Sequence, residues 1–148
     1  MTLALEKKAA QILGSDISLS ALRIARENAT RLGARVDFVA CDLAAAFSSF
    51  DVIVSNPPYV PLRDRAGLQR EVRDFEPAQA LFGGKDGNDV YRKLIPAAAR
   101  ALKPGGWLIL ELGDAEAVNG MLVRWESVAT VNDLAGIARV GVARTRSD

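Results

Sequence analysis

Hydrophobic and polar positions follow a helical period in several segments of the chain. In the clearest of them, Ser18 can cap the first turn and Gly33 can end the last, with apolar residues at every third or fourth position between them. Pro96 lies inside another, where it should kink or split the helix because it lacks an amide hydrogen. We expect helices over Thr2–Lys8, between Ser18 and Gly33, between Asn88 and Leu102, and over Asp114–Val123.

Short apolar runs between these helices predict strands. Val52, Ile53 and Val54 are continuous, which is typical of a strand buried in a parallel sheet. The long charged and glycine-rich connection from Val60 to Gly87 has no such run, and connections of this length are usually functional or disordered. We expect strands near Gln11–Gly14, Val36–Ala40, Phe50–Ser55, Trp107–Leu112, Ser127–Val131 and Ile137–Arg144, with turns at Lys103–Gly106 and Asn132–Gly136.

The alternation of strands with helices predicts an α/β domain built on a parallel sheet. In such sheets ligands bind at the carboxyl ends of the strands. Asp16, Asp42, Asn56 and Glu111 all fall at or near predicted strand ends, and together they outline a polar site. Taken singly, each could instead cap a helix or begin a turn, as Asp and Asn often do.

Composition narrows the chemistry that this site can perform. The 148 residues contain no histidine, which excludes Ser-His-Asp and Cys-His catalysis, and a single cysteine, which excludes a disulfide framework or a cysteine-cluster metal site. We expect no metal. The net charge of +1 gives no general attraction to nucleic acid or membranes, and no apolar stretch is long enough to span a bilayer. The single thiol favours the cytoplasm.

The segment Asn56-Pro57-Pro58-Tyr59 is the strongest chemical signal. Two prolines stop the strand and leave the carbonyls of Asn56 and Pro57 without regular partners. These carbonyls and the Asn56 side chain can accept both hydrogens of a planar NH2 group, while Tyr59 offers a flat apolar face. Such acceptors stabilise the charge that develops on a weakly nucleophilic nitrogen, so no strong base is needed. A plain proline-rich turn is the alternative.

This segment resembles the catalytic motif of S-adenosylmethionine-dependent amino-methyltransferases. The longer context resembles the protein-(glutamine-N5) methyltransferases, which modify the glutamine of the Gly-Gly-Gln loop in peptide chain release factors. The motif Asn-Pro-Pro-Tyr is shared with adenine methyltransferases, whereas the segment from Glu71 to Gly87 points to the glutamine branch. The resemblance rests on SDISLSALRIARENATRLG, VACDL, DVIVSNPPYVP, EVRDFEPAQALFGGKDGNDVYRKLI, LKPGGWLILELG and NDLAGIARV, which cover most of the chain.

The resemblance implies a Rossmann-like methyltransferase sheet and a role for each motif residue. S-adenosylmethionine is the implied cofactor, and peptide chain release factors are the implied partners, with no direct nucleic-acid or membrane binding. Glu76-Pro77 and Gly83–Gly87 would shape the peptide groove. The implied cofactor residues are Asp16 for the ribose, Asp42 and Leu43 for the adenine, and Ile17 and Asn56; the implied catalytic residues are Asn56, Pro57 and Tyr59, which with Pro58 also hold the substrate amide.

The chain departs from the family pattern at its start. The family's first strand and its Gly-rich D-x-G-x-G-x-G loop have no counterpart before Asp16, nor does the preceding helical domain that binds the release factor. We therefore expect residues 1–148 to form one incomplete catalytic domain, with open edges on the strands ending at Asp16 and Asn56. Two other functions stay open: an adenine-amino methyltransferase of DNA or RNA, which a near-neutral charge disfavours, and an inactive binding module.

Overall fold

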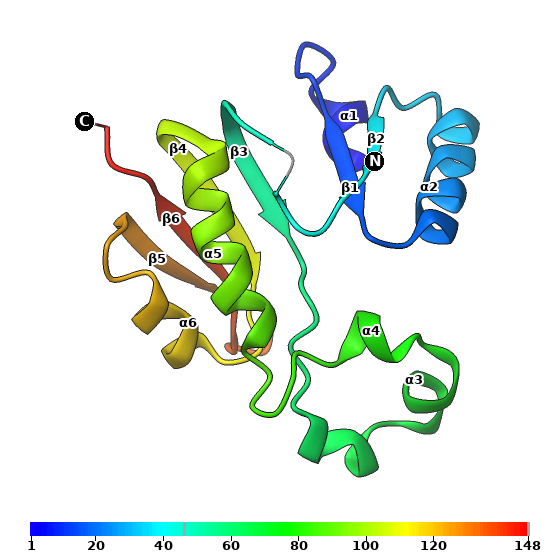
Figure 1. The fold of residues 1–148 in the computed structure, drawn as a ribbon, viewed down its shortest axis with the longest axis vertical. Helices are drawn as coiled ribbons and strands as arrows, with labels where there is room; N and C mark the ends of the chain where they lie inside the picture. The colour runs from blue at the N-terminus through cyan, green and yellow to red at the C-terminus, as the bar shows by residue number, and fades with distance from the viewer. Residues whose placement is uncertain (46, 148) are drawn as a thin grey trace. The chain divides into compact units, whose positions relative to one another are not determined.

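A computed structural model describes residues 1–45 and 47–147. The chain divides into two compact units, Met1–Ala46 and Phe47–Asp148, and each is described by itself. In both units helices pack on parallel strand pairs, which confirms the predicted α/β class (Figure 1).

The first unit contains two helices and a two-stranded sheet. Strands β1 (Leu13–Asp16) and β2 (Asp37–Ala40) are parallel, with Asp16 opposite Ala40. The predicted caps of α2 (Leu19–Leu32) are confirmed: the Ser18 hydroxyl accepts a hydrogen bond from the Ala21 amide at 3.2 Å, and Gly33 ends the helix with φ +65°. Helix α1 (Thr2–Glu6) precedes β1, and the small core holds Ala4, Leu22, Ala29 and Ala44.

The second unit is built on a mixed sheet with strand order β3-β4-β6-β5. Strands β3 (Phe50–Ser55) and β4 (Leu102–Glu111) are parallel, whereas β6 (Ala138–Arg144) is antiparallel to both β4 and β5 (Glu126–Asn132). The predicted parallel pairing therefore holds for β3 and β4, whereas β6 runs antiparallel to both of its neighbours. The short turn between β5 and β6 is the reason, because a few residues can connect only antiparallel neighbours.

Two helices cover this sheet and form most of its core with β4. Helix α5 (Asp89–Ala101) contacts β4, while α6 (Ala115–Met121) contacts β6 and α5. The inward side chains of β4 alternate along the strand, as a half-buried strand requires. The buried side chains include Tyr91, Leu94 and Ala98 of α5, Leu108 and Leu110 of β4, Leu112, Val118 of α6, and Leu122.

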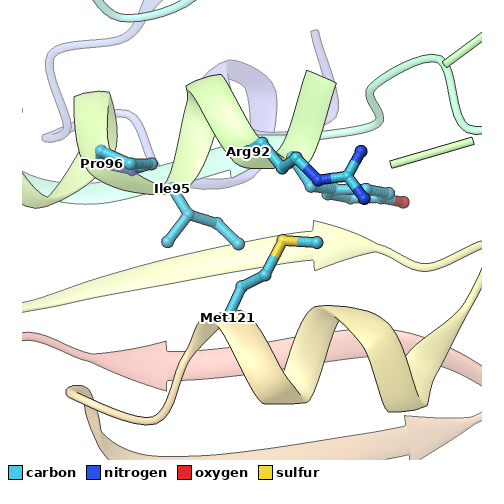
Figure 2. Close-up of a pocket in the computed structure, with 5 residues that line it drawn as sticks. Arg92, Ile95, Pro96 and Met121 are labelled. Carbon is cyan, nitrogen blue, oxygen red and sulfur yellow. The ribbon is translucent and has the colours of Figure 1, made fainter. Parts of the chain in front are cut away.

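Helix α5 runs without interruption through Pro96, so the predicted split does not occur. Pro96 lies on the exposed side of the helix, where only one backbone hydrogen bond is lost. Figure 2 shows Pro96 beside Ile95 at a shallow pocket, with Met121 pointing toward α5 from the end of α6.

Strand β3 has the predicted bounds but not the predicted burial. The side chains of Val52 and Val54 are 47% and 56% exposed, because the described residues cover their face of the strand only in part. Among the described strands, β1 pairs with β2 alone and β3 with β4 alone, so each has an unpaired edge.

Two expected loops contain regular structure. The connection after Val60 holds the short helices η1 (Leu62–Gly67), α3 (Arg70–Phe75) and α4 (Ala78–Leu81), which form without burying any of their residues. The expected turn at Lys103–Gly106 lies inside β4, whose pairing with β3 shifts register there; Gly105, at φ +73°, accommodates the irregularity. None of the described helices has the length and apolar character needed to cross a membrane.

Candidate functional site

In the first unit, the carboxyl end of β1 places Asp16 where the sequence predicts it. One carboxylate oxygen of Asp16, Oδ1, accepts a hydrogen bond from the Ser18 amide at 2.8 Å, so the residue helps to start α2. The side chain is nevertheless exposed, and its Oδ2 takes no hydrogen bond from the described residues. Asp16 therefore combines the capping role with a free acceptor that is held in a fixed direction.

Asp42 and Leu43 follow β2, next to Asp16 in the parallel pair. The Asp16 carbonyl accepts the Cys41 amide at 3.2 Å, which keeps the two strand ends together. Leu43 adopts a left-handed backbone with φ +53°, and its carbonyl accepts hydrogen bonds from the Ser15 hydroxyl and the Cys41 thiol, both at 3.2 Å. These contacts hold the unusual turn in place, and Asp42 is left exposed at its start.

The first unit therefore presents two exposed carboxylates with apolar side chains beside them. Ile17 is 56% exposed and Leu43 is half-buried. Carboxylates accept hydrogen bonds from hydroxyl and amino groups, and exposed aliphatic side chains can cover a flat ring. These acceptors and apolar side chains fit the hydroxyl groups, amino group and flat ring of a nucleoside.

In the second unit, the segment Asn56–Tyr59 leaves the end of β3 in an extended form. Asn56 is exposed and Pro57 is buried. None of the described residues donates a hydrogen bond to the carbonyl of either one. The two acceptors that the sequence identifies thus have no hydrogen-bond donor among the described residues.

Residues 81–87, which we call the glycine loop, pack against this segment and against Val60, which follows it. The Val60 amide donates to the Leu81 carbonyl at 2.9 Å, and the Gly83 amide donates to the Val60 carbonyl at 3.0 Å. A methyl group on Gly83 would lie 2.6 Å from the Pro58 carbonyl oxygen, and one on Gly87 would overlap that of Tyr59. Only glycine at these two positions allows so close a backbone approach.

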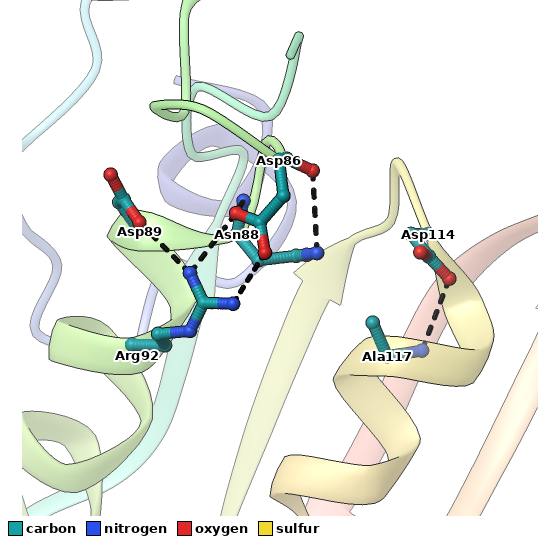
Figure 3. Close-up of polar contacts among 6 residues, drawn as sticks. All are labelled: Asp86, Asn88, Asp89, Arg92, Asp114 and Ala117. Atoms are coloured by element: carbon teal, nitrogen blue, oxygen red, sulfur yellow. Dashed lines mark hydrogen bonds and ion pairs between the residues drawn. The ribbon is translucent and has the colours of Figure 1, made fainter.

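An ion-pair cluster ties the glycine loop to the first turn of α5 (Figure 3). The Asp86 carboxylate accepts hydrogen bonds from the Arg92 guanidinium and from the Asn88 amide, the latter at 3.1 Å. Arg92 also donates to Asp89 at 2.8 Å. The Arg92 charge and hydrogen bonds hold the pKa of Asp86 well below its usual range, so this cluster is charged throughout the neutral range.

Tyr59 is anchored to the end of β4. Its hydroxyl donates to the Glu111 carboxylate at 2.9 Å, and burial together with this hydrogen bond raises the pKa of Tyr59. The Tyr59 ring also lies against Gly113, where an added methyl group would come within 2.5 Å of the ring. The hydroxyl of the buried Tyr91 donates to the Glu111 carbonyl at 2.6 Å, and burial raises the pKa of Tyr91 to about 12.

The structure brings the predicted residues together as two groups, one on each unit. Asp16, Ile17, Asp42 and Leu43 form the first group, and the Asn56–Tyr59 segment with Glu111 forms the second. Tyr91 and Gly113 are neighbours of the second group that the sequence does not reveal, because their partners lie far away along the chain. The ligand roles of all these residues stay predictions.

Comparisons with known proteins agree with the sequence motifs. Residues 1–72 match the model of the methyltransferase small domain. The chain is 45% identical over 148 residues to the release factor glutamine methyltransferase of Koribacter versatilis, covering 97% of this chain and 53% of the relative. It is 46% identical over 146 residues to the enzyme of the same name from Geobacter sulfurreducens, covering 95% and 51%. The chain thus spans about half the length of the curated relatives it matches.

Solved structures agree on the fold. A methyltransferase from Pyrococcus furiosus superposes with a TM-score of 0.67 at 22% identity, covering 98% of this chain and 68% of that one. The Rossmann-like methyltransferase fold is therefore confirmed. The resemblance to release factor glutamine methyltransferases is also confirmed, since relatives of that name match nearly the whole chain.

Proposed function

We infer that the protein takes part in methyl transfer to a side-chain amide nitrogen, because the chain is similar along nearly its whole length to release factor glutamine methyltransferases. The observation that carries this proposal is the Asn56–Tyr59 segment at the end of β3, where two carbonyls accept no hydrogen bond from the described residues and the aromatic ring is anchored. We propose that the protein transfers a methyl group to the glutamine of the Gly-Gly-Gln loop in peptide chain release factors.

S-adenosylmethionine is the proposed cofactor, and when bound it supplies an electrophilic methyl group. The exposed carboxylate of Asp16 would accept hydrogen bonds from the ribose hydroxyls, and Asp42 would accept one from the adenine amino group. Ile17 and Leu43 would cover the adenosine with apolar surface. The family resemblance also implies Asn56, at the end of β3, as a cofactor residue.

The chemistry proposed for the Asn56–Tyr59 segment is positioning and electrostatic stabilisation. An amide nitrogen is a poor nucleophile because its lone pair is delocalised into the carbonyl. The Asn56 side chain and the Asn56 and Pro57 carbonyls would accept both amide hydrogens, which favours the charge that develops on nitrogen. Pro58 and Tyr59 would confine the amide in one orientation, and orientation supplies much of the rate of an in-line displacement.

The direct test is methylation of a purified release factor by the full-length protein with S-adenosylmethionine. Mass spectrometry of the peptide that contains the Gly-Gly-Gln sequence should show one added methyl group on glutamine. Asn56→Ala should abolish this modification, because it removes one acceptor and loosens the others. Asn28→Ala, on helix α2 outside the proposed site, is the matched control and should leave the modification intact.

Three results would contradict the proposal in different ways. Methylation of oligonucleotide adenine in place of release factor would establish the adenine-amino function. Release-factor binding without any methylation would establish a binding module. An unchanged rate in Asn56→Ala would show that the acceptor residues are wrongly assigned. The cytoplasmic location that the single cysteine favours stays a prediction.

A further inference from the structure

Glu111 is an ionisable residue beside the acceptor segment that the proposed chemistry does not use. Its carboxylate accepts the Tyr59 hydroxyl at 2.9 Å, although the two residues are 52 positions apart in the chain. A charge-assisted hydrogen bond of this kind is among the stronger single contacts that a surface side chain can make. Tyr59 is thus fixed at the tip of its ring.

The end of β4 that carries Glu111 is itself held firmly. The Tyr91 hydroxyl donates to the Glu111 carbonyl at 2.6 Å and accepts the Gly113 amide at 3.2 Å, and Tyr91 is fully buried in the core. The next residue, Leu112, donates its amide to the Arg139 carbonyl at 2.8 Å. The backbone that carries the Glu111 carboxylate is therefore held in place by buried hydrogen bonds.

Gly113 completes the contact from the other end of the ring. A methyl group on Gly113 would lie 2.5 Å from Tyr59 Cδ2 and 2.9 Å from Tyr59 Cβ, so only glycine lets the ring settle there. Tyr59 is held at its hydroxyl by Glu111 and at its base by Gly113. The ring can neither rotate away nor slide along the strand end without losing one of these contacts.

We propose that Glu111 is a positioning residue for methyl transfer, which acts by holding the Tyr59 ring beside the Asn56 and Pro57 acceptors. This inference rests on the proposed function. Glu111 acts here as a hydrogen-bond acceptor and not as a base, so a neutral acceptor of the same shape should replace it. A carboxylate that removed a proton from the substrate could not be replaced in that way.

The test compares substitutions at both ends of the hydrogen bond in the full-length protein. Glu111→Ala should lower kcat for release-factor methylation by about 10- to 100-fold, the cost of a misplaced reacting group. Glu111→Gln keeps an acceptor oxygen and should recover most of that loss. Tyr59→Phe should match Glu111→Ala, and the double variant should be no slower than either single one. Glu126→Ala, at an exposed glutamate of β5, is the control.

A second readout reports the contact without relying on activity. Within residues 1–148 the tyrosines are Tyr59 and Tyr91, and loss of one NMR signal in Tyr59→Phe assigns the Tyr59 signal of a tyrosine ring carbon label. Glu111→Ala should shift the Tyr59 signal and lower its titration midpoint, because the hydrogen bond and the carboxylate charge both raise the pKa of Tyr59. Glu111→Gln should leave the ring position near that of the wild type.

The possible results distinguish failure of the Glu111 inference from failure of the proposed function on which it rests. A wild-type protein that leaves release factors unmodified overturns the proposed function and the positioning role with it, whatever the NMR signals show. With an active wild type, an unchanged Tyr59 signal or an unchanged kcat in Glu111→Ala overturns the inference alone. A Glu111→Gln variant as slow as Glu111→Ala also overturns it, because a neutral acceptor of the same shape would then not be sufficient.

Discussion

The Tyr59 ring packs so closely on Gly113 that a substitution to alanine tests the contact. Gly113→Ala should push the ring away from Glu111 and cost about 1–3 kcal/mol in the free energy of unfolding, as overpacking generally does. Urea denaturation checks this value. Gly120→Ala is the matched control: a methyl group there meets nothing within 4 Å in helix α6, so this change should stabilise by about 0.5–1 kcal/mol. Equal effects of the two changes would contradict the packing.

The Tyr91 hydroxyl makes the stability of the protein depend on alkaline pH. Burial raises its pKa from 10.0 to about 12, so the folded state holds this proton more tightly than the unfolded state. The raised pKa of Tyr91 adds its full stabilisation below pH 10. This stabilisation, roughly 2–3 kcal/mol in the free energy of unfolding, is lost as the pH rises to about 12. Denaturation of wild type and Tyr91→Phe between pH 8 and about 12 checks the sign. The free energies of unfolding of the two proteins should converge as the pH rises. A difference that stays constant over this pH range would contradict the raised pKa of Tyr91.

The glycine loop is the element on which the shape of the acceptor segment depends. A side chain at Gly83 would meet two backbone groups, the carbonyls of Pro58 and Gly87, and neither can move aside as a flexible side chain could. Gly83→Ala should therefore destabilise by about 1–3 kcal/mol and reduce methylation, both measurable on the purified protein. Gly67→Ala, at the end of η1 with nothing within 4 Å, should change stability by less than about 0.5 kcal/mol.

Elements with strong local signals were predictable, and those without them were not. Helix α2 has a cap, an apolar stripe and a terminal glycine, and its bounds follow from these alone. The helices η1, α3 and α4 bury no residue, so they produce no hydrophobic period for a sequence pattern to detect. The exposure of Val52 and Val54 depends on what covers β3, which the strand's own sequence cannot specify.

The same limit applies to the site. Asn56–Tyr59 was identifiable because its chemistry lies in four consecutive residues. The Tyr59–Glu111 and Tyr91–Glu111 contacts join distant parts of the chain, whereas the sequence pattern marks Glu111 only as one strand-end residue among several. Sequence motifs thus indicate the proposed acceptor residues, whereas the residues that hold them in place become visible only once the strands are aligned.

For the chain as a whole, the two units differ in how much core they contain. The buried apolar side chains of the first unit are Ala4, Leu22, Ala29 and Ala44, of which only one is large. The second unit buries Tyr91, Leu94, Leu108 and Leu110 among others. Buried apolar area is the main source of stability, so the first unit should open more often than the second.

Native-state hydrogen exchange tests this difference. Amides of α2 should exchange faster than those of β4 at Leu108 and Leu110. The exchange of the α2 amides should also depend less on low concentrations of urea, because opening the first unit exposes less surface. Leu22→Ala removes the one large buried side chain of the first unit and should accelerate exchange in α2 while β4 keeps its protection. If α2 and β4 instead exchanged with one common free energy in both proteins, the chain would unfold as a single cooperative unit. Asp16 and Asp42, the residues proposed to bind the cofactor, would then be held as stably as the acceptor segment.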